Sequence, residues 1–232
     1  MMSVAKSLAH MIYRRVFWTS PALHLTYLNA RGFKTDFSDV SVVVQGFPRS
    51  GNTYLSIALS DFKAFEGRVF SHIHTPAIFA HAIRHDIPVV MPVRDPMSSL
   101  VSLSQLAGWD DRRCIDHYLC YYRYSKPYLK QLAVIEFTSF TQDTPSALSR
   151  LSARTGLKFR HADHAQIETQ AFGEIDKRSV ANAGEIEAHT VHRPNQTRSA
   201  QKAEIRERLE QNHGPALLRC EALYQQFLAE AI

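Results

Sequence analysis

The chain has 232 residues, 45% of them apolar, so it can bury a substantial core, and we expect one domain over residues 1–232. Its three cysteines, Cys114, Cys120 and Cys220, show no CxxC spacing, which argues against a disulfide scaffold and for a reducing compartment. The formal charge of +5 suits a protein that binds polyanions. The lysines and arginines are scattered rather than gathered in a stripe with stacking aromatics, so nucleic acid is not an expected partner.

Residues 1–35 are expected to form an N-terminal helical segment. Its first part, residues 1–18, is apolar apart from interruptions such as Lys6, Arg14 and Arg15. Because it has no long hydrophobic region and no small-residue cleavage site, we expect no secretory signal and predict a cytoplasmic protein. Residues 1–18 have two interpretations: a helix packed on the core, which we favour, or a basic amphipathic helix that would make the protein membrane-peripheral.

Strands and helices are predicted to alternate along most of the chain. The expected strands are residues 40–46, 68–74, 88–93 and 132–137. The expected helices are residues 52–62, 76–84, 96–107, 110–131, 145–156, 201–212 and 215–230. This alternation predicts an α/β fold, a three-layer sandwich with a central parallel sheet.

The first strand leads through a glycine-bounded turn into a helix. Gly46, four residues, Gly51, one polar residue and Thr53 nearly match the Walker A spacing. Free N–H groups and the helix dipole favour an anion in such a loop. Asn52 stands where a nucleotide-triphosphate enzyme needs lysine, and the cation lies inside the loop, at Arg49. We therefore predict a P-loop-like strand–loop–helix nucleotide site without the usual kinase lysine.

A second motif follows the strand at residues 88–93. Asp95 is expected to cap a helix that starts at Pro96, where a missing N–H is tolerated. Arg94 is thereby placed at the carboxyl end of a strand, which is the edge where open α/β sheets bind ligands.

The two motifs resemble those of sulfotransferases that use 3′-phosphoadenosine-5′-phosphosulfate (PAPS), and the resemblance covers residues 42 to about 156. In that family the loop reads Pro-Lys/Arg-Ser/Thr-Gly-Thr/Asn-Thr-aromatic. The matching residues here are Pro48, Arg49, Ser50, Gly51, Asn52, Thr53 and Tyr54. The resemblance implies that this loop binds the 5′-phosphosulfate, that Arg49 stabilises the leaving phosphate, and that Tyr54 flanks the adenine.

The same resemblance implies roles for residues outside the loop. Family members hold the 3′-phosphate with an arginine and with a serine eight residues later, which here are Arg94 and Ser102. A tyrosine that lies near the adenine in many members corresponds to Phe137. An Arg-Lys-Gly element that contacts the 3′-phosphate has no equivalent here, and the nearest candidates are Arg193 and Arg198.

A histidine two residues before a proline, between the two cofactor motifs, is the general base in this family. That pattern selects His74, with Pro76, whereas the usual distance back from Arg94 selects His72. In an extended strand the two imidazoles would share one face. A metal site at this pair is not expected, because no third ligand follows at suitable spacing.

The region from 157 to 200 shows no regular pattern and is too long for an idle connection, so we expect a loop region that covers the active site. The implied function is transfer of a sulfuryl group from PAPS to a hydroxyl acceptor, less readily to an amine, without a metal. Two alternatives are a P-loop kinase-like phosphotransferase and a non-catalytic nucleotide-binding module. The sequence does not choose among small-molecule, glycan and lipid acceptors, and it does not reveal the oligomeric state.

Overall fold

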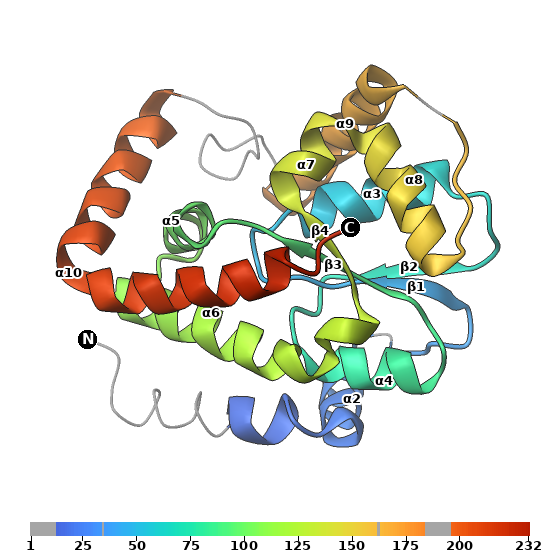
Figure 1. Ribbon diagram of the computed structural model, residues 1–232, viewed down its shortest axis with the longest axis horizontal. Helices are drawn as coiled ribbons and strands as arrows, with labels where there is room; N and C mark the ends of the chain where they lie inside the picture. The colour runs from blue at the N-terminus through green and yellow to red at the C-terminus, as the bar shows by residue number, and fades with distance from the viewer. Residues whose placement is uncertain (1–12, 34, 162, 184–195) are drawn as a thin grey trace.

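The computed structural model describes residues 13–33, 35–161, 163–183 and 196–232. Its centre is a parallel sheet in the order β2-β1-β3-β4, and helices lie on both faces of the sheet (Figure 1). The strands are β1 (Val40–Val44), β2 (Arg68–Ser71), β3 (Val89–Val93) and β4 (Ala133–Glu136). The predicted α/β architecture with a central parallel sheet is confirmed.

The helices follow the strands in the predicted alternation. They are α2 (Pro21–Ala30), α3 (Asn52–Phe62), α4 (Ala77–Arg84), α5 (Pro96–Ala107), α6 (Asp111–Ser125), the 3-10 helix η1 (Lys126–Gln131), α7 (Phe137–Gln142), α8 (Thr144–Thr155), α9 (His164–Ala183) and α10 (Gln196–Leu228).

The sheet separates two apolar cores, because successive side chains of a strand point to opposite faces. Val42 and Val44 of β1 pack under α3, α7, α8 and α9, and Val43 packs on the other side with α2, α4, α5, α6 and α10. All three valines are fully buried. Both faces are therefore covered, which is why β3 is apolar throughout and β1 is apolar except for Ser41.

Some predicted boundaries differ from the structure for local reasons. The single helix expected at residues 110–131 is α6 followed by the tighter η1, and the change occurs beside Pro127, which has no N–H for an α-helical bond. Phe137, expected at the end of a strand, is the first residue of α7, where the side chain of Glu136 accepts a hydrogen bond from Ser139 N at 2.6 Å.

The region predicted to be irregular contains α9. Ile167, Ala171 and Ile175 recur every four residues, and all three are buried against the core under α3. The polar composition of the segment obscured this apolar stripe. The two C-terminal helices expected from the sequence are the two halves of α10, which are divided by a kink at the non-helical His213, next to Gly214 and Pro215.

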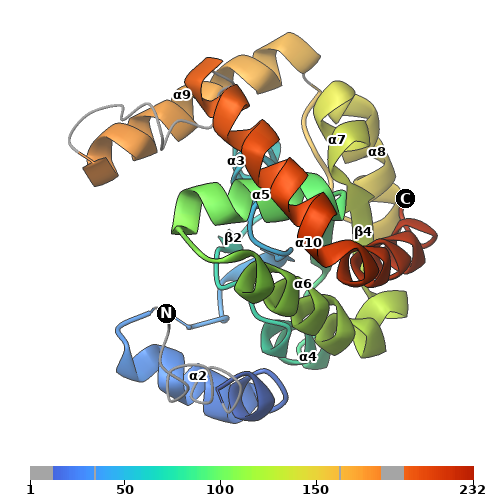
Figure 2. The same cartoon turned by 90° about the vertical axis from the view of Figure 1, so that its left-hand side faces the viewer.

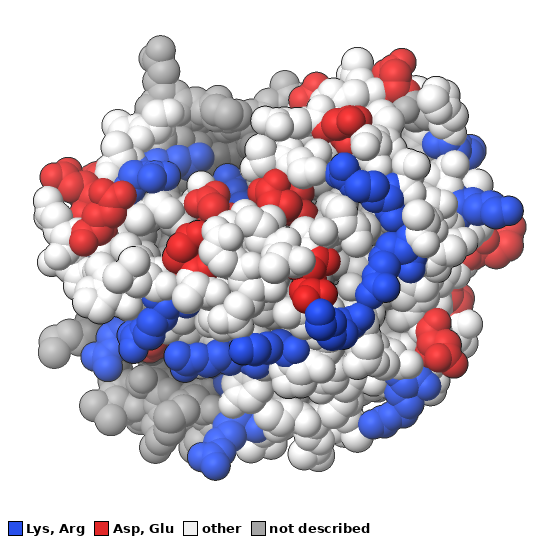
Figure 3. All heavy atoms as spheres, in the orientation of Figure 1, with Lys and Arg blue, Asp and Glu red and all other residues white. Residues whose placement is uncertain are grey.

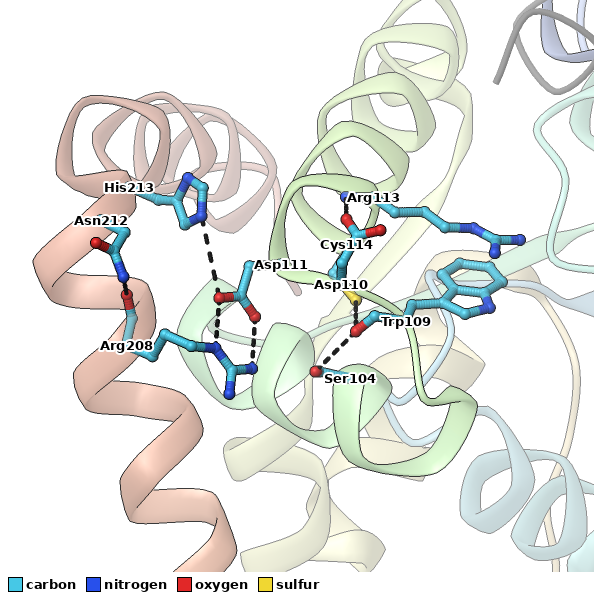
Figure 4. Close-up of polar contacts among 9 residues, drawn as sticks. All are labelled: Ser104, Trp109, Asp110, Asp111, Arg113, Cys114, Arg208, Asn212 and His213. Carbon is cyan, nitrogen blue, oxygen red and sulfur yellow. Dashed lines mark hydrogen bonds and ion pairs between the residues drawn. The ribbon is translucent and has the colours of Figure 1, made fainter. Parts of the chain in front are cut away.

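The first half of α10 is fastened to α6 by an ion pair (Figure 4). Arg208 donates to both carboxylate oxygens of Asp111, at 2.7 and 2.8 Å, and Asp111 is only 8% exposed. His213, at the kink, lies with Nε2 4.0 Å from the same carboxylate. This pair aligns the kinked helix along α6.

We expect Arg208→Ala to lower the free energy of unfolding by about 1–2 kcal/mol, because a buried carboxylate loses a bidentate partner. The effect stays moderate because the Arg208 side chain is 43% exposed. The control Arg206→Ala removes an exposed cation two residues away and should change stability by less than about 0.5 kcal/mol. Urea unfolding measures both, and equal values would contradict the role of this pair.

Candidate functional site

The predicted anion loop lies at the carboxyl ends of the two central strands. The chain leaves β1 through residues 45–51, enters α3, and then adds β2 on one side of β1, whereas β3 lies on the other side. The strand order therefore reverses direction at this point. In open α/β sheets, ligands bind in the crevice at such a reversal.

Two glycines allow the loop to pack closely against its neighbours. A Cβ at Gly46 would lie 2.4 Å from the carbonyl oxygen of Pro92 in β3. Gly51 has a φ of +91°, and a Cβ there would lie 2.5 Å from the ring of Phe137. No larger residue fits at either position without displacing backbone or ring.

Asn52 holds the loop closed from inside. Its Oδ1 accepts a hydrogen bond from Gly46 N at 2.6 Å, and its Nδ2 donates to Phe47 O at 2.8 Å. The side chain is 4% exposed. The Asn52 amide is thus bonded to the loop backbone, and the loop that it closes remains the predicted phosphate site. The first N–H groups of α3 have no partners within the helix and are left to face an anion.

Arg49 has a backbone conformation that is unusual for a residue with a side chain. Its φ is +72°, in the left-handed region. This conformation sends the guanidinium across to α5, where Nε donates to Ser102 Oγ at 2.9 Å. Non-glycine residues in this region cluster at functional sites, where surrounding structure offsets their cost.

Arg94 lies beside Arg49, as the predicted site requires. Its Nη1 donates to Arg49 O at 3.1 Å, and its guanidinium carbon is 4.5 Å from the centre of the Phe137 ring. Burial lowers the pKa of Arg94, and Asp95 and Glu136 oppose this effect. Within the described part of the chain, no carboxylate lies within ion-pair distance of Arg94. The structure thus places two arginines, Ser102 and Phe137 in one cluster over Gly51.

Both candidate histidines lie at this edge, although not in the predicted strand. β2 ends at Ser71, and His72 and His74 have φ values of +74° and +54°. The argument from alternating strand side chains therefore fails. The rings are nevertheless neighbours, with centroids 6.1 Å apart.

The two histidines differ in their partners. His74 Nδ1 is 3.0 Å from Gly46 O, and a carbonyl oxygen only accepts, so Nδ1 carries the hydrogen. In the neutral ring, Nε2 then holds the lone pair. Burial lowers the pKa of His74, and the nearby Arg49 lowers it further. His72 is exposed, and both of its nitrogens contact hydroxyls, Nδ1 that of Ser71 and Nε2 that of Thr53.

Other predicted residues of the loop face inward. Tyr54 is 6% exposed and packs against Phe140 and Phe172, so its ring faces the core, and its predicted position beside the adenine stays a prediction. Ser50 is fully buried beneath the loop, close to Tyr122 but without a hydrogen bond of good geometry between them. Thr53 and Pro48 keep partly exposed side chains.

The structure does not describe the side chains of Arg193 and Arg198, the two candidates for a further contact to the 3′-phosphate. Arg193 lies outside the described residues. Arg198 belongs to α10, and its side chain is not described. Residues 157–200 are predicted to cover the active site. Their described part includes α9, which packs beside α3, and a covering role stays a prediction.

Two tyrosines of α6, Tyr118 and Tyr121, support the site from below. Tyr118 and Tyr121 of α6 donate to the carbonyl oxygens of Arg94 and Gln45, at 3.5 and 3.2 Å. Burial raises the pKa of Tyr121, so its hydroxyl keeps its proton. Their spacing on one helix face was the available signal, but their contacts depend on the fold.

A metal site or a cavity among the described residues would be a further place for a ligand. No group of three or more His, Cys, Asp and Glu side chains in the described ranges could hold a metal ion. An open cavity of 360 Å³ lies at the opposite edge of the sheet, where Val89 and Ala133 line it together with Lys130 and Arg154. It shares no residue with the loop or its arginines.

The strand order and covering helices match the fold of sulfotransferases. One solved structure with this fold is the mouse sulfotransferase SULT7A1 complexed with PAP. It has a TM-score of 0.50 and 11% sequence identity, and the match covers 80% of this chain and 89% of that one. No protein-family model and no curated protein matches the chain. At this identity, the likeness shows the fold alone.

We expect Asn52→Ala to lower the free energy of unfolding by about 1–3 kcal/mol, because Gly46 N and Phe47 O lose buried partners. The control Thr53→Ala changes the next, partly exposed side chain and should cost less than about 1 kcal/mol. Thermal unfolding of both variants measures the difference. Unchanged stability of Asn52→Ala would show that the loop closes without this side chain.

Proposed function

We propose that the protein transfers a sulfuryl group from PAPS to a hydroxyl acceptor. The observation that carries this proposal is the cluster of Arg49, Arg94, Ser102 and Phe137 beside the N-terminus of α3. Three segments far apart in the chain supply it, and it presents two cations next to a ring. This combination suits a nucleotide with anionic groups at two places and a flat base.

The binding roles follow from where each side chain lies. The N–H groups at the start of α3 and Thr53 bind the 5′-phosphate. Arg94, partly buried and without a carboxylate partner in the described chain, binds the 3′-phosphate together with Ser102. Phe137 packs on the base. Ser102 also accepts from Arg49, so it links the residues that bind the two ends of the nucleotide.

The chemical roles fall to His74 and Arg49. PAPS, when bound, supplies the sulfuryl group and a phosphate leaving group. His74 Nε2 accepts the proton of the acceptor hydroxyl, and the hydrogen bond from Nδ1 to Gly46 O fixes the ring for this task. Arg49 stabilises the charge that develops on the leaving phosphate. Its guanidinium keeps its proton, so this assistance is electrostatic.

The structure favours this proposal over a phosphotransferase. A P-loop kinase uses a lysine at the position of Asn52, whose side chain here closes the loop. The carboxylates at the ends of β3 and β4 are occupied as helix caps. Asp95 accepts from Ser98 N at 2.8 Å, and Glu136 accepts from Ser139 N at 2.6 Å.

The test is calorimetric titration with PAP, with ATP plus magnesium in parallel. We expect PAP to bind and ATP to bind much more weakly. Arg94→Ala should weaken PAP binding about 10–100-fold, the loss of one charged hydrogen-bonding partner, while the exposed control Arg84→Ala should not change it. Magnesium-dependent ATP binding would support the kinase alternative instead. Unchanged PAP affinity in Arg94→Ala would remove the assignment of the 3′-phosphate.

His74→Ala should reduce turnover by about 100-fold or more and leave PAP affinity unchanged, because the base is lost but the nucleotide site remains. The assay is transfer of labelled sulfate from PAPS to a panel of phenols, sugars and hydroxylated lipids. His72→Ala is the matched control and should retain most turnover; the reverse result would make His72 the base. PAP binding without transfer to any acceptor would support the non-catalytic module.

The pH dependence of the reaction tests the same assignment. Because the pKa of His74 is lowered, the base stays neutral down to a lower pH than an ordinary histidine. The acidic limb of kcat/KM should therefore lie below pH ~6.5, the usual histidine value. A limb above that value would contradict the role of His74.

A further inference from the structure

The net positive charge of the chain arises from residues 1–35. Of the 27 lysines and arginines, five precede residue 36, and no Asp or Glu does. The remaining 22 are matched by 22 acidic residues in the rest of the chain. Figure 3 shows this balance on one face, where acidic and basic side chains are interspersed. The formal charge of +5 therefore belongs to the N-terminal segment and not to the nucleotide site.

The same segment exposes an unusual share of apolar surface. Among the described residues, five large hydrophobic side chains are exposed, and three of them are Val16, Leu23 and Phe33, at 39%, 52% and 49%. In the same segment Tyr13, Phe17 and Tyr27 lie together, with ring centroids 4.9–5.4 Å apart and side chains only partly buried. Residues 13–33 thus combine exposed apolar, aromatic and basic groups, and their exposed part is here called the N-terminal surface.

α2 is attached to the body through His24 and Leu28, which are buried, and through Leu25 and Tyr27, which are partly buried against the core. Its exposed side carries Leu23 together with smaller or polar residues. The helix has apolar residues all round, a pattern that is typical of helices with partners on every side. Figure 2 shows α2 at the margin of the body that contains the sheet. Among the described residues, one side of α2 is consequently open to a partner.

We propose that the N-terminal surface binds the surface of an anionic lipid bilayer. Arg15 and Arg31 are exposed and face no acidic residue within their own segment, so they are suited to lipid phosphates. Leu23 and Phe33 supply the apolar groups that enter the acyl boundary, and tyrosines are enriched at that depth. Among the described residues, no helix is long and apolar enough to cross a bilayer, and the binding proposed is peripheral.

This surface adjoins the candidate site through one contact. The His24 ring lies 3.3 Å from Thr75 Oγ1, and Thr75 follows His74. Burial lowers the pKa of His24 to about 4, so the ring packs there uncharged. The bilayer would therefore bind an element that touches the segment of the candidate base. The proposal itself does not depend on the proposed reaction.

The experiment is sedimentation of the full chain with vesicles of phosphatidylcholine alone and of phosphatidylcholine with phosphatidylserine. We expect binding to the anionic vesicles, at least tenfold weaker binding to the neutral ones, and a decrease as salt rises from ~0.05 to ~0.5 M. R15E/R31E should reduce anionic binding by at least about 30-fold. L23Q/F33Q should reduce it by about tenfold, because apolar burial is lost.

Matched controls change the same residue types elsewhere. R206E/R219E alters the net charge equally on α10, and L106Q/L218Q removes the other two exposed hydrophobic side chains. Both controls should bind like the wild type, and circular dichroism should show that all four variants fold. Equal losses in variants and controls, or no binding to anionic vesicles, would overturn the proposal. So would a self-association or an RNA affinity that depends on the same residues while vesicles are ignored.

Discussion

The site depends on the close approach of the loop after β1 to the neighbouring strand. Gly46 leaves no room for a side chain against Pro92, and Asn52 fixes both Gly46 and Phe47 from inside the turn. With the loop held in this way, the N-terminus of α3 opens at the carboxyl edge of the sheet. A lysine at position 52 could not make both bonds, because an ammonium group only donates. Position 52 can therefore hold either the asparagine that closes this loop or the lysine of a kinase-type loop, but not both functions at once.

From this fixed loop, the cationic cluster is assembled by contacts between distant segments. Arg49, turned by its left-handed backbone, reaches Ser102 on α5, and Arg94 spans from the Arg49 carbonyl to the Phe137 ring. A partly buried guanidinium that packs on a ring and a carbonyl retains unused donors for an anion. The tyrosines of α6 hold the strand ends from below. The cluster therefore lies in short connections and helices held by packing, and not in a long loop.

Two separate places on the protein carry the charges proposed to bind anions. At the proposed nucleotide site they are few, partly buried and directed by hydrogen bonds, which suits recognition of a defined anion. At the N-terminal surface they are exposed, free of acidic neighbours in sequence and mixed with Leu23 and Phe33, which suits an extended anionic surface. The net charge of +5 does not distinguish these two arrangements, because it is a sum over all charged residues of the chain.

The sequence by itself determined the order of strands and helices, the turn at Gly46 and Gly51, and the cap formed by Asp95, because these depend on neighbouring residues and on periodicity. Its resemblance to sulfotransferase motifs also singled out Arg49, Arg94, Ser102 and Phe137, which the fold brings into one cluster. Only the tertiary structure decided that Tyr54 packs inward, that Asn52 serves the backbone and that His74 bonds to Gly46. The direction of a side chain depends on the segments packed around it. For Tyr54 these are Phe140 and Phe172, more than eighty residues away, and no local pattern encodes them.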